Sequence, residues 1–260
     1  MCLRAIAAPN VRWAESEQDA LTERYATAQA DLAARGATAV GEAYELAAQS
    51  SVAVFAAPLA YALMLLDERF NHVNYHKGVN GGTRSAAPPE HDAMRLGVDA
   101  RLYGNIGALI TMAALAPTPV GLPSYGQVFM QFSERACAKR ASVLSENSFP
   151  FIDKFGGLES QPRGLRATWD DRARLALVVA ADRLDASTAP QDFPGIMMAA
   201  GASRADDRFM EVHLYDDWNI ESLVGMTMLQ SSIMSKLAIA QAEELGDLLS
   251  KRGMKWTIGP

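Results

Sequence analysis

The sequence predicts an α+β protein, in which a helical region precedes a larger part built on strands. Three observations predict it. Residues 1–50 are Ala-rich and carry apolar residues at helical spacing. Residues 128–132 and 209–214 alternate with the period of two that is typical of strands. Residues 223–249 return to a helical pattern, and a short final strand is expected after them.

The N-terminal region, residues 1–50, is expected to form at least two helices. After Ser16, a candidate helix N-cap, apolar residues recur at intervals of four, three and four positions, namely Leu21, Tyr25, Ala28 and Leu32. Gly36 and Gly41 interrupt this stripe, and a second helical piece carries Tyr44 and Leu46. We therefore divide the chain into a helical region over 1–50 and an α+β domain over 51–260.

The first half of that domain contains an apolar run and two candidate strands. Residues 52–66 are apolar but contain Pro58 and fall short of the ~20 residues that a membrane span needs, so we interpret them as buried core. A turn follows at Asn80–Gly82. Arg101 is placed on a short strand ending in Gly104, and residues 128–132 form a second strand.

The second half is predicted to contain helices on either side of one strand. Residues 169–184 are helical in pattern, and "RFMEVHLY" (208–215) is a strand. One or two helices with a Met-rich face are expected between Leu223 and Leu249. The last of these helices is expected to end at Gly253, where glycine can adopt the left-handed cap. A short last strand follows it.

Composition excludes several classes of protein. Of 260 residues, 49% are hydrophobic and 21% are charged, which is ordinary for a folded globular chain. A net charge of -6 with interspersed signs argues against broad nucleic-acid binding. The two cysteines, Cys2 and Cys137, form no metal-binding or disulfide pattern. Without a signal-peptide core or a membrane span, we expect a cytoplasmic location.

The pair Glu211 and His213 is the first candidate for chemistry. On an extended strand these two residues share one face with Phe209, whereas Met210, Val212 and Leu214 occupy the other. The second face is wholly apolar and must be core. A carboxylate beside a histidine can act as a catalytic pair, and the alternative is a solvated strand face.

Other candidates are weaker as motifs. Arg101 could fork onto a phosphate or a carboxylate, or form a structural ion pair. The "GVNGG" turn with Asn80 could cradle phosphate through backbone N–H groups. In "KRASVLSENSF", Ser142 and Ser148 lack the motif of a serine nucleophile and could simply satisfy a turn. The histidines form no HExxH motif, so no metal site is predicted.

Five segments follow one another in this order: "GVNGG", "ARLYGNIG", "YGQVFMQFSE…KRASVLSENSF", "RFMEVHLYDDWNIESLVG" and "LLSKRGMKW". In this order they resemble an uncharacterised bacterial family that looks related to toxin-type ADP-ribosyltransferases. The similarity covers about residues 50–260 in short blocks. It implies a split antiparallel sheet that holds NAD in a central cleft and transfers ADP-ribose to a protein or small-molecule acceptor.

The resemblance also implies roles for single residues. Arg101, beside Gly104 and Asn80, would orient NAD, and Tyr103 or Tyr125 would stack on its nicotinamide. Ser142 or Ser148 would position Glu211, whose carboxylate favours the cationic transition state with His213 beside it.

This sequence departs from that family's pattern in three ways. The usual Glu-x-Glu pair is Glu211-x-His213 here, and a Ser-Thr-Ser element is missing. The early strand "SSVAVFAAP" also has neither the histidine nor the arginine that some of these families place there. A catalytically inactive relative that acts as a binding or assembly module is therefore the alternative, and homo-oligomerisation is left open. Its motivation is the Ala-rich helical region at the N-terminus together with the Met-rich face of the C-terminal helix, because methionine surfaces adapt to partners.

Overall fold

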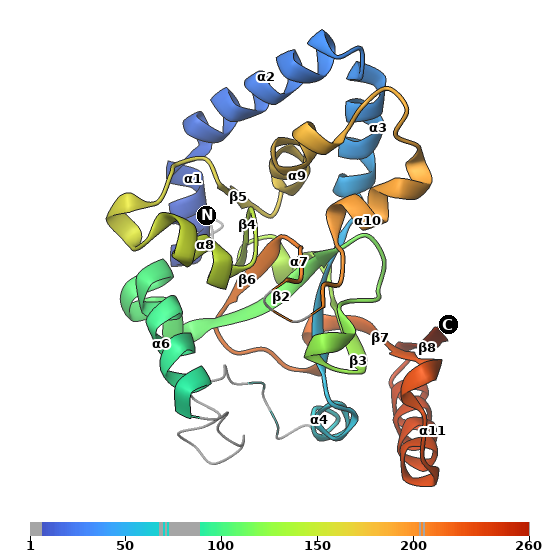
Figure 1. Cartoon of the computed structure of the whole chain (residues 1–260). Coiled ribbons are helices and arrows are strands. Elements are labelled where there is room, and N and C mark those ends of the chain that lie inside the picture. The colour runs from blue at the N-terminus through green and yellow to red at the C-terminus, as the bar shows by residue number, and fades with distance from the viewer. Residues whose placement is uncertain are drawn as a thin grey trace, which may run out of the picture.

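The structure is a computed structural model that describes residues 7–67, 70, 72, 89–202, 204 and 206–259, with the side chains of 89–93 and Leu158 left out. Its centre is one eight-stranded sheet in the order β5-β4-β6-β2-β1-β3-β7-β8 (Figure 1). The strands are β1 Val52–Ala57, β2 Ile110–Ala116, β3 Val128–Phe132, β4 Ala141–Leu144, β5 Arg166–Thr168, β6 Glu211–Tyr215, β7 Leu223–Leu229 and β8 Lys255–Gly259. All neighbours are antiparallel except β7 and β8, which are parallel.

The helices lie before, between and after the strands, so the α+β class is confirmed. They are α1 Pro9–Ser16, α2 Gln18–Ala34, α3 Thr38–Gln49, α4 Leu59–Met64, α6 Pro89–Tyr103, α7 Glu134–Cys137, α8 Ser148–Phe155, α9 Arg172–Ala180, α10 Phe193–Met197 and α11 Lys236–Lys251. The expected split antiparallel arrangement differs from what is observed. The sheet is continuous, and its last strand pairs in the parallel sense because α11 carries the chain back alongside β7.

The described part of residues 1–50 is helical, as predicted. Helices α2 and α3 pack on α9, while α1 packs against β4 and β5 (Figure 1). Ser16 is the last residue of α1 rather than the cap of α2, because its hydroxyl donates to the Trp13 carbonyl one turn back. Gly36 separates α2 from α3 with a φ of 68°, a conformation that glycine adopts without steric cost.

One face of the sheet, which we call the apolar face, carries buried residues from six strands: Ala53, Leu115, Met130, Val143, Val212 and Met226. They form one cluster with side chains of α2, α3, α4, α7, α9, α10 and α11. The predicted alternation of β6 is confirmed here, because Met210, Val212 and Leu214 all belong to this cluster. Burial of this face supplies most of the driving force for folding.

The opposite face, which we call the polar face, carries Ser142, Arg166, Glu211 and His213, all of them buried. Pairing places Ser142 beside His213, and Leu144 between Arg166 and Glu211. Helices α6 and α8 cover this face with a smaller apolar cluster that includes Leu102 and Phe151. The candidate chemistry therefore lies under a second, thinner layer of helices.

Two expected elements are wrong. Arg101 lies in the last turn of α6 rather than on a strand, because Val98 and Leu102 are buried at the four-residue spacing of a helix. Residues Leu223–Leu229, expected as helix, form β7, in which Met226 and Met228 face the core between β3 and β8. The helix predicted in this stretch begins only at Lys236.

The strands at 128–132 and 211–215, the helix within 169–184 and the final strand are confirmed. Gly253 ends the chain's last helical turn with a φ of 67°, as expected. In the part of the chain that the structure describes, every helix is too short or too polar to cross a bilayer.

Candidate active site

Glu211 is the first residue of β6, and its side chain is only 6% exposed. One carboxylate oxygen, Oε2, accepts a hydrogen bond of 2.6 Å from the backbone N–H of Ser148, the first residue of α8. Helix N-termini carry unpaired N–H groups and partial positive charge, both of which favour an anion. The sequence segments around residues 148 and 211 therefore meet at one charge-assisted contact.

His213 lies two residues further along the same face and is also buried. Its Nε2 is 3.6 Å from Glu211 Oε2, and its Nδ1 hydrogen-bonds the hydroxyl of Tyr103. Burial raises the pKa of that hydroxyl to about 12, so it keeps its proton and can donate to Nδ1. The other ring nitrogen, Nε2, is on the side that faces Glu211.

The pKa of Glu211 is lowered despite its burial. Removal from water opposes ionisation, but His213, the charge of Arg95 and the Ser148 N–H together outweigh it. Arg95 comes from α6, where it also pairs with Asp99 at 3.0 Å and lies 5.5 Å from the ring of Phe149. Glu211 is therefore an ionised carboxylate in a poorly hydrated place, which strengthens its field on nearby atoms.

A second buried charge lies on the polar face next to this pair. Arg166 of β5 forms an ion pair with Glu17 at 3.2 Å, with side-chain exposures of 2% and 5%. The guanidinium of Arg166 lies 4.4 Å from the Trp13 ring and 5.9 Å from the Tyr103 ring. This ion pair ties the N-terminal helices to the residues that surround His213.

Asn10 of α1 connects the N-terminal region to the candidate site directly. Its amide nitrogen, which is fully buried, lies 2.8 Å from the His213 carbonyl, 3.1 Å from Ser142 Oγ and 3.1 Å from the Arg140 carbonyl. Ser142 thus lies beside His213 and contacts Asn10. Sequence reasoning missed Asn10, because nothing local distinguishes it from other polar residues of a helix.

Ser148 contacts Glu211, but through its backbone rather than its hydroxyl. Its Oγ is buried and has no hydrogen-bond partner among the described residues. The preceding residue, Asn147, caps α8 by accepting a 3.0 Å bond from the Phe149 N–H. An asparagine just before a helical segment is a recognisable start signal, and it could have identified this position.

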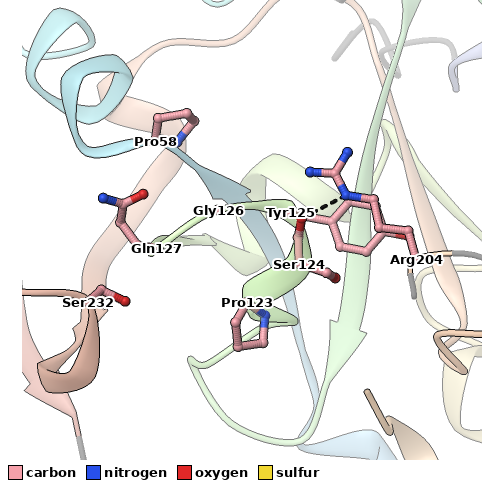
Figure 2. Close-up of a pocket in the computed structure, with 8 residues that line it drawn as sticks. All are labelled: Pro58, Pro123, Ser124, Tyr125, Gly126, Gln127, Arg204 and Ser232. Atoms are coloured by element: carbon pink, nitrogen blue, oxygen red, sulfur yellow. Dashed lines mark hydrogen bonds between the residues drawn. The ribbon is translucent and has the colours of Figure 1, made fainter. Parts of the chain in front are cut away.

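Tyr125 links this buried cluster to an open pocket. The Tyr125 hydroxyl lies 3.1 Å from Asn147 Nδ2, and the Tyr125 ring packs edge-on against Phe209 with the ring centroids 5.8 Å apart. Burial, together with the charges of Glu211 and Asp207, raises the pKa of Tyr125 to about 12. The pocket measures about 460 Å³ and is lined by Pro58, Pro123, Ser124, Tyr125, Gly126, Gln127, Arg204 and Ser232 (Figure 2).

Arg101 and Gly104 lie away from the site. The Arg101 side chain is exposed, and its carbonyl accepts a hydrogen bond from Gln161. Tyr103, two positions along α6, points to His213, so Arg101 projects roughly 200° away around the helix. Gly104 follows the helix with a φ of 55°, which is the conformation of a helix-ending glycine rather than of a phosphate loop.

Asn80, the remaining predicted site residue, lies outside the described residues, as does the "GVNGG" turn. Of the residues that the structure does describe, no three His, Cys, Asp or Glu side chains lie close enough together to hold a metal ion. Comparison with protein-family models finds no match for this chain, and comparison with curated proteins finds none either.

Proposed function

We propose that this protein transfers ADP-ribose from NAD to a protein or small-molecule acceptor, with Glu211 as its catalytic carboxylate. The observation that supports it most is the 2.6 Å bond from the Ser148 N–H to Glu211 Oε2. It joins the two segments, "KRASVLSENSF" and "RFMEVHLY", that carry the resemblance to ADP-ribosyltransferases. Their residues are 63 positions apart in the chain, so only folding brings them together.

The proposed reaction breaks the glycosidic bond between nicotinamide and ribose C1′. Nicotinamide leaves with the electron pair of that bond, and an acceptor nucleophile then bonds to C1′ and loses a proton. The transition state carries positive charge on the ribose. An ionised carboxylate that accepts a hydrogen bond from a ribose hydroxyl favours this charge, and the lowered pKa of Glu211 keeps it ionised at neutral pH.

The substrate would reach Glu211 from the pocket beside Tyr125. Tyr125 lines the pocket and is hydrogen-bonded to Asn147, which directly precedes the Ser148 that binds Glu211. The role predicted for Arg101 finds no support, because its side chain is exposed on α6, whereas Arg95 lowers the pKa of Glu211.

The test is release of nicotinamide from NAD, measured by chromatography with and without a lysate as the source of acceptor. We expect Glu211→Gln to lower the rate by roughly 100-fold or more, as for loss of a group that stabilises transition-state charge. Glu221→Gln is the matched control, because Glu221 is exposed and remote from the cluster. Wild-type protein that neither binds NAD nor releases nicotinamide would refute the proposal.

A second candidate function is that of a binding or assembly module, and exposed apolar side chains near the C-terminus favour it. Met234, Leu237 and Ile239 are 86%, 68% and 45% exposed, at or just before the start of α11. In the sheet that the structure describes, β8 is an edge strand paired with β7, and its Ile258 is 45% exposed. Light scattering on wild type and Leu237→Glu is the test, and a strict monomer with no captured partner would contradict this function.

A further inference from the structure

Arg204 is the one arginine among the residues that line the pocket beside Tyr125, and its surroundings hold it in place (Figure 2). Its Nε donates a 2.7 Å hydrogen bond to the Ser124 carbonyl, and its guanidinium carbon lies 5.0 Å from the Tyr125 ring centroid. A guanidinium held over an aromatic ring by one nitrogen has a restricted orientation. Among the residues that the structure describes, its two terminal nitrogens have no hydrogen-bond partner.

No carboxylate neutralises Arg204 among the residues that the structure describes. Asp207, on the same loop as Arg204, already accepts two hydrogen bonds. Its Oδ2 accepts a 2.6 Å bond from Ser124 Oγ, and its Oδ1 accepts a 2.9 Å bond from the Gly201 N–H. The first bond fastens the loop that carries Arg204 to the loop that carries Tyr125, and the second lies within the Arg204 loop itself. The pocket is thus built around a cation without a paired anion.

Part of the pocket lining is backbone, at Gly126. Gly126 lies so close to the end of β1 that a Cβ added to it would be 2.5 Å from the Ala57 backbone N and C atoms. Glycine is therefore required for this approach. Gln127 and Ser232 add polar side chains across from Arg204 (Figure 2). Pockets of about 300–1,000 Å³ are those that accept small molecules, and this one measures about 460 Å³.

We propose that this pocket binds a small molecule through an oxyanion, a phosphate or a carboxylate, which the terminal nitrogens of Arg204 hold in a forked contact. Arginine matches both anions because its parallel N–H groups fit two oxygens at once. This inference does not require ADP-ribosyl transfer. A ligand seated here would contact Tyr125, whose hydroxyl is bonded to Asn147 at the N-terminus of α8.

The test is calorimetric titration of the full chain at low salt with pyrophosphate and, separately, with citrate. We expect at least one of them to bind, and Arg204→Gln to weaken that binding roughly 10- to 100-fold, the loss expected for a charge-assisted pair. Arg208→Gln is the matched control, because Arg208 is exposed on the same loop, contacts the Gly195 carbonyl and does not line the pocket.

The two titrations distinguish the class of anion that the pocket binds. Binding of pyrophosphate alone identifies a phosphate ligand, and binding of citrate alone identifies a carboxylate ligand; both support the proposal if Arg204→Gln loses them. Failure of the wild type to bind either anion overturns it, as does equal weakening by Arg204→Gln and Arg208→Gln. The Glu211→Gln variant should bind the anion normally while losing nicotinamide release, so failure of this proposal is distinct from failure of the catalytic one.

Discussion

The two faces of the sheet differ in chemistry although both are buried. The apolar face forms one continuous cluster with side chains from seven of the described helices, and its strand residues are almost all aliphatic or methionine. The polar face holds Glu211, His213, Ser142 and Arg166 under α6 and α8, with smaller apolar clusters around them. Burial of the apolar face stabilises the fold, whereas burial of the polar and charged groups on the other face costs free energy unless they are hydrogen-bonded.

The compensation on the polar face is incomplete. Buried atoms without a hydrogen-bond partner among the described residues include Ser148 Oγ, His213 Nε2, Arg166 Nε and Asn10 Oδ1. Each such atom costs about 1–3 kcal/mol relative to a satisfied one. Several unsatisfied buried polar atoms around one ionised carboxylate are characteristic of functional sites, where stability is sacrificed for chemistry. The difference between the faces is therefore a second structural reason, beside the Ser148 contact, for the function that we propose at Glu211.

The largest expected effect tests the apolar face. Leu115 of β2 is fully buried in the main cluster, so Leu115→Ala should lower the free energy of unfolding by about 2–5 kcal/mol, through lost burial and the cavity left behind. Urea denaturation measures it. Leu46→Ala is the control, because Leu46 is 72% exposed and should change little. Equal effects of the two substitutions would contradict the assignment of the core.

An intermediate effect tests the polar face through pH. The pKa of Glu211 is held below its ordinary value of 4.5 in the folded chain. Its ionised form therefore contributes stability that is present above pH 4.5 and is lost as the pH falls through the folded pKa. We expect the free energy of unfolding of wild type to exceed that of Glu211→Gln by about 1–3 kcal/mol at neutral pH. This difference should shrink in acid.

Urea titrations of both proteins at neutral and acidic pH measure that excess. Glu221→Gln, at an exposed position, should show no such pH dependence relative to wild type. A difference between wild type and Glu211→Gln that grows as the pH falls would reverse the sign expected for a carboxylate stabilised in its ionised form.

The smallest expected effect lies outside both faces. Arg101 is exposed on α6 and contacts neither Glu211 nor the pocket lining. Arg101→Gln should change the free energy of unfolding by less than about 0.5 kcal/mol and leave nicotinamide release unchanged. A large loss of turnover in this variant would restore the role that the sequence predicts for Arg101 and would argue against the placement of α6.

Prediction from the sequence succeeded where a pattern is local and long enough. The alternation of Met210, Val212 and Leu214 defines β6 and its buried side, and the stripe Leu21, Ala28 and Leu32 defines α2. It failed for Leu223–Leu229, because methionine and leucine suit a helix as well as a buried strand, and pairing with β3 and β8 decides between them.

The sequence by itself determined the α+β class, the strand that carries Glu211 and His213, and the side of that strand on which they lie. Only the tertiary structure decided which groups surround them. The Ser148 N–H, the Tyr103 hydroxyl and the Asn10 amide reach this pair from segments 63, 110 and 203 positions away. Periodicity reports how a residue faces its own element, whereas the partners of a buried charge depend on how distant elements pack, which no local pattern encodes.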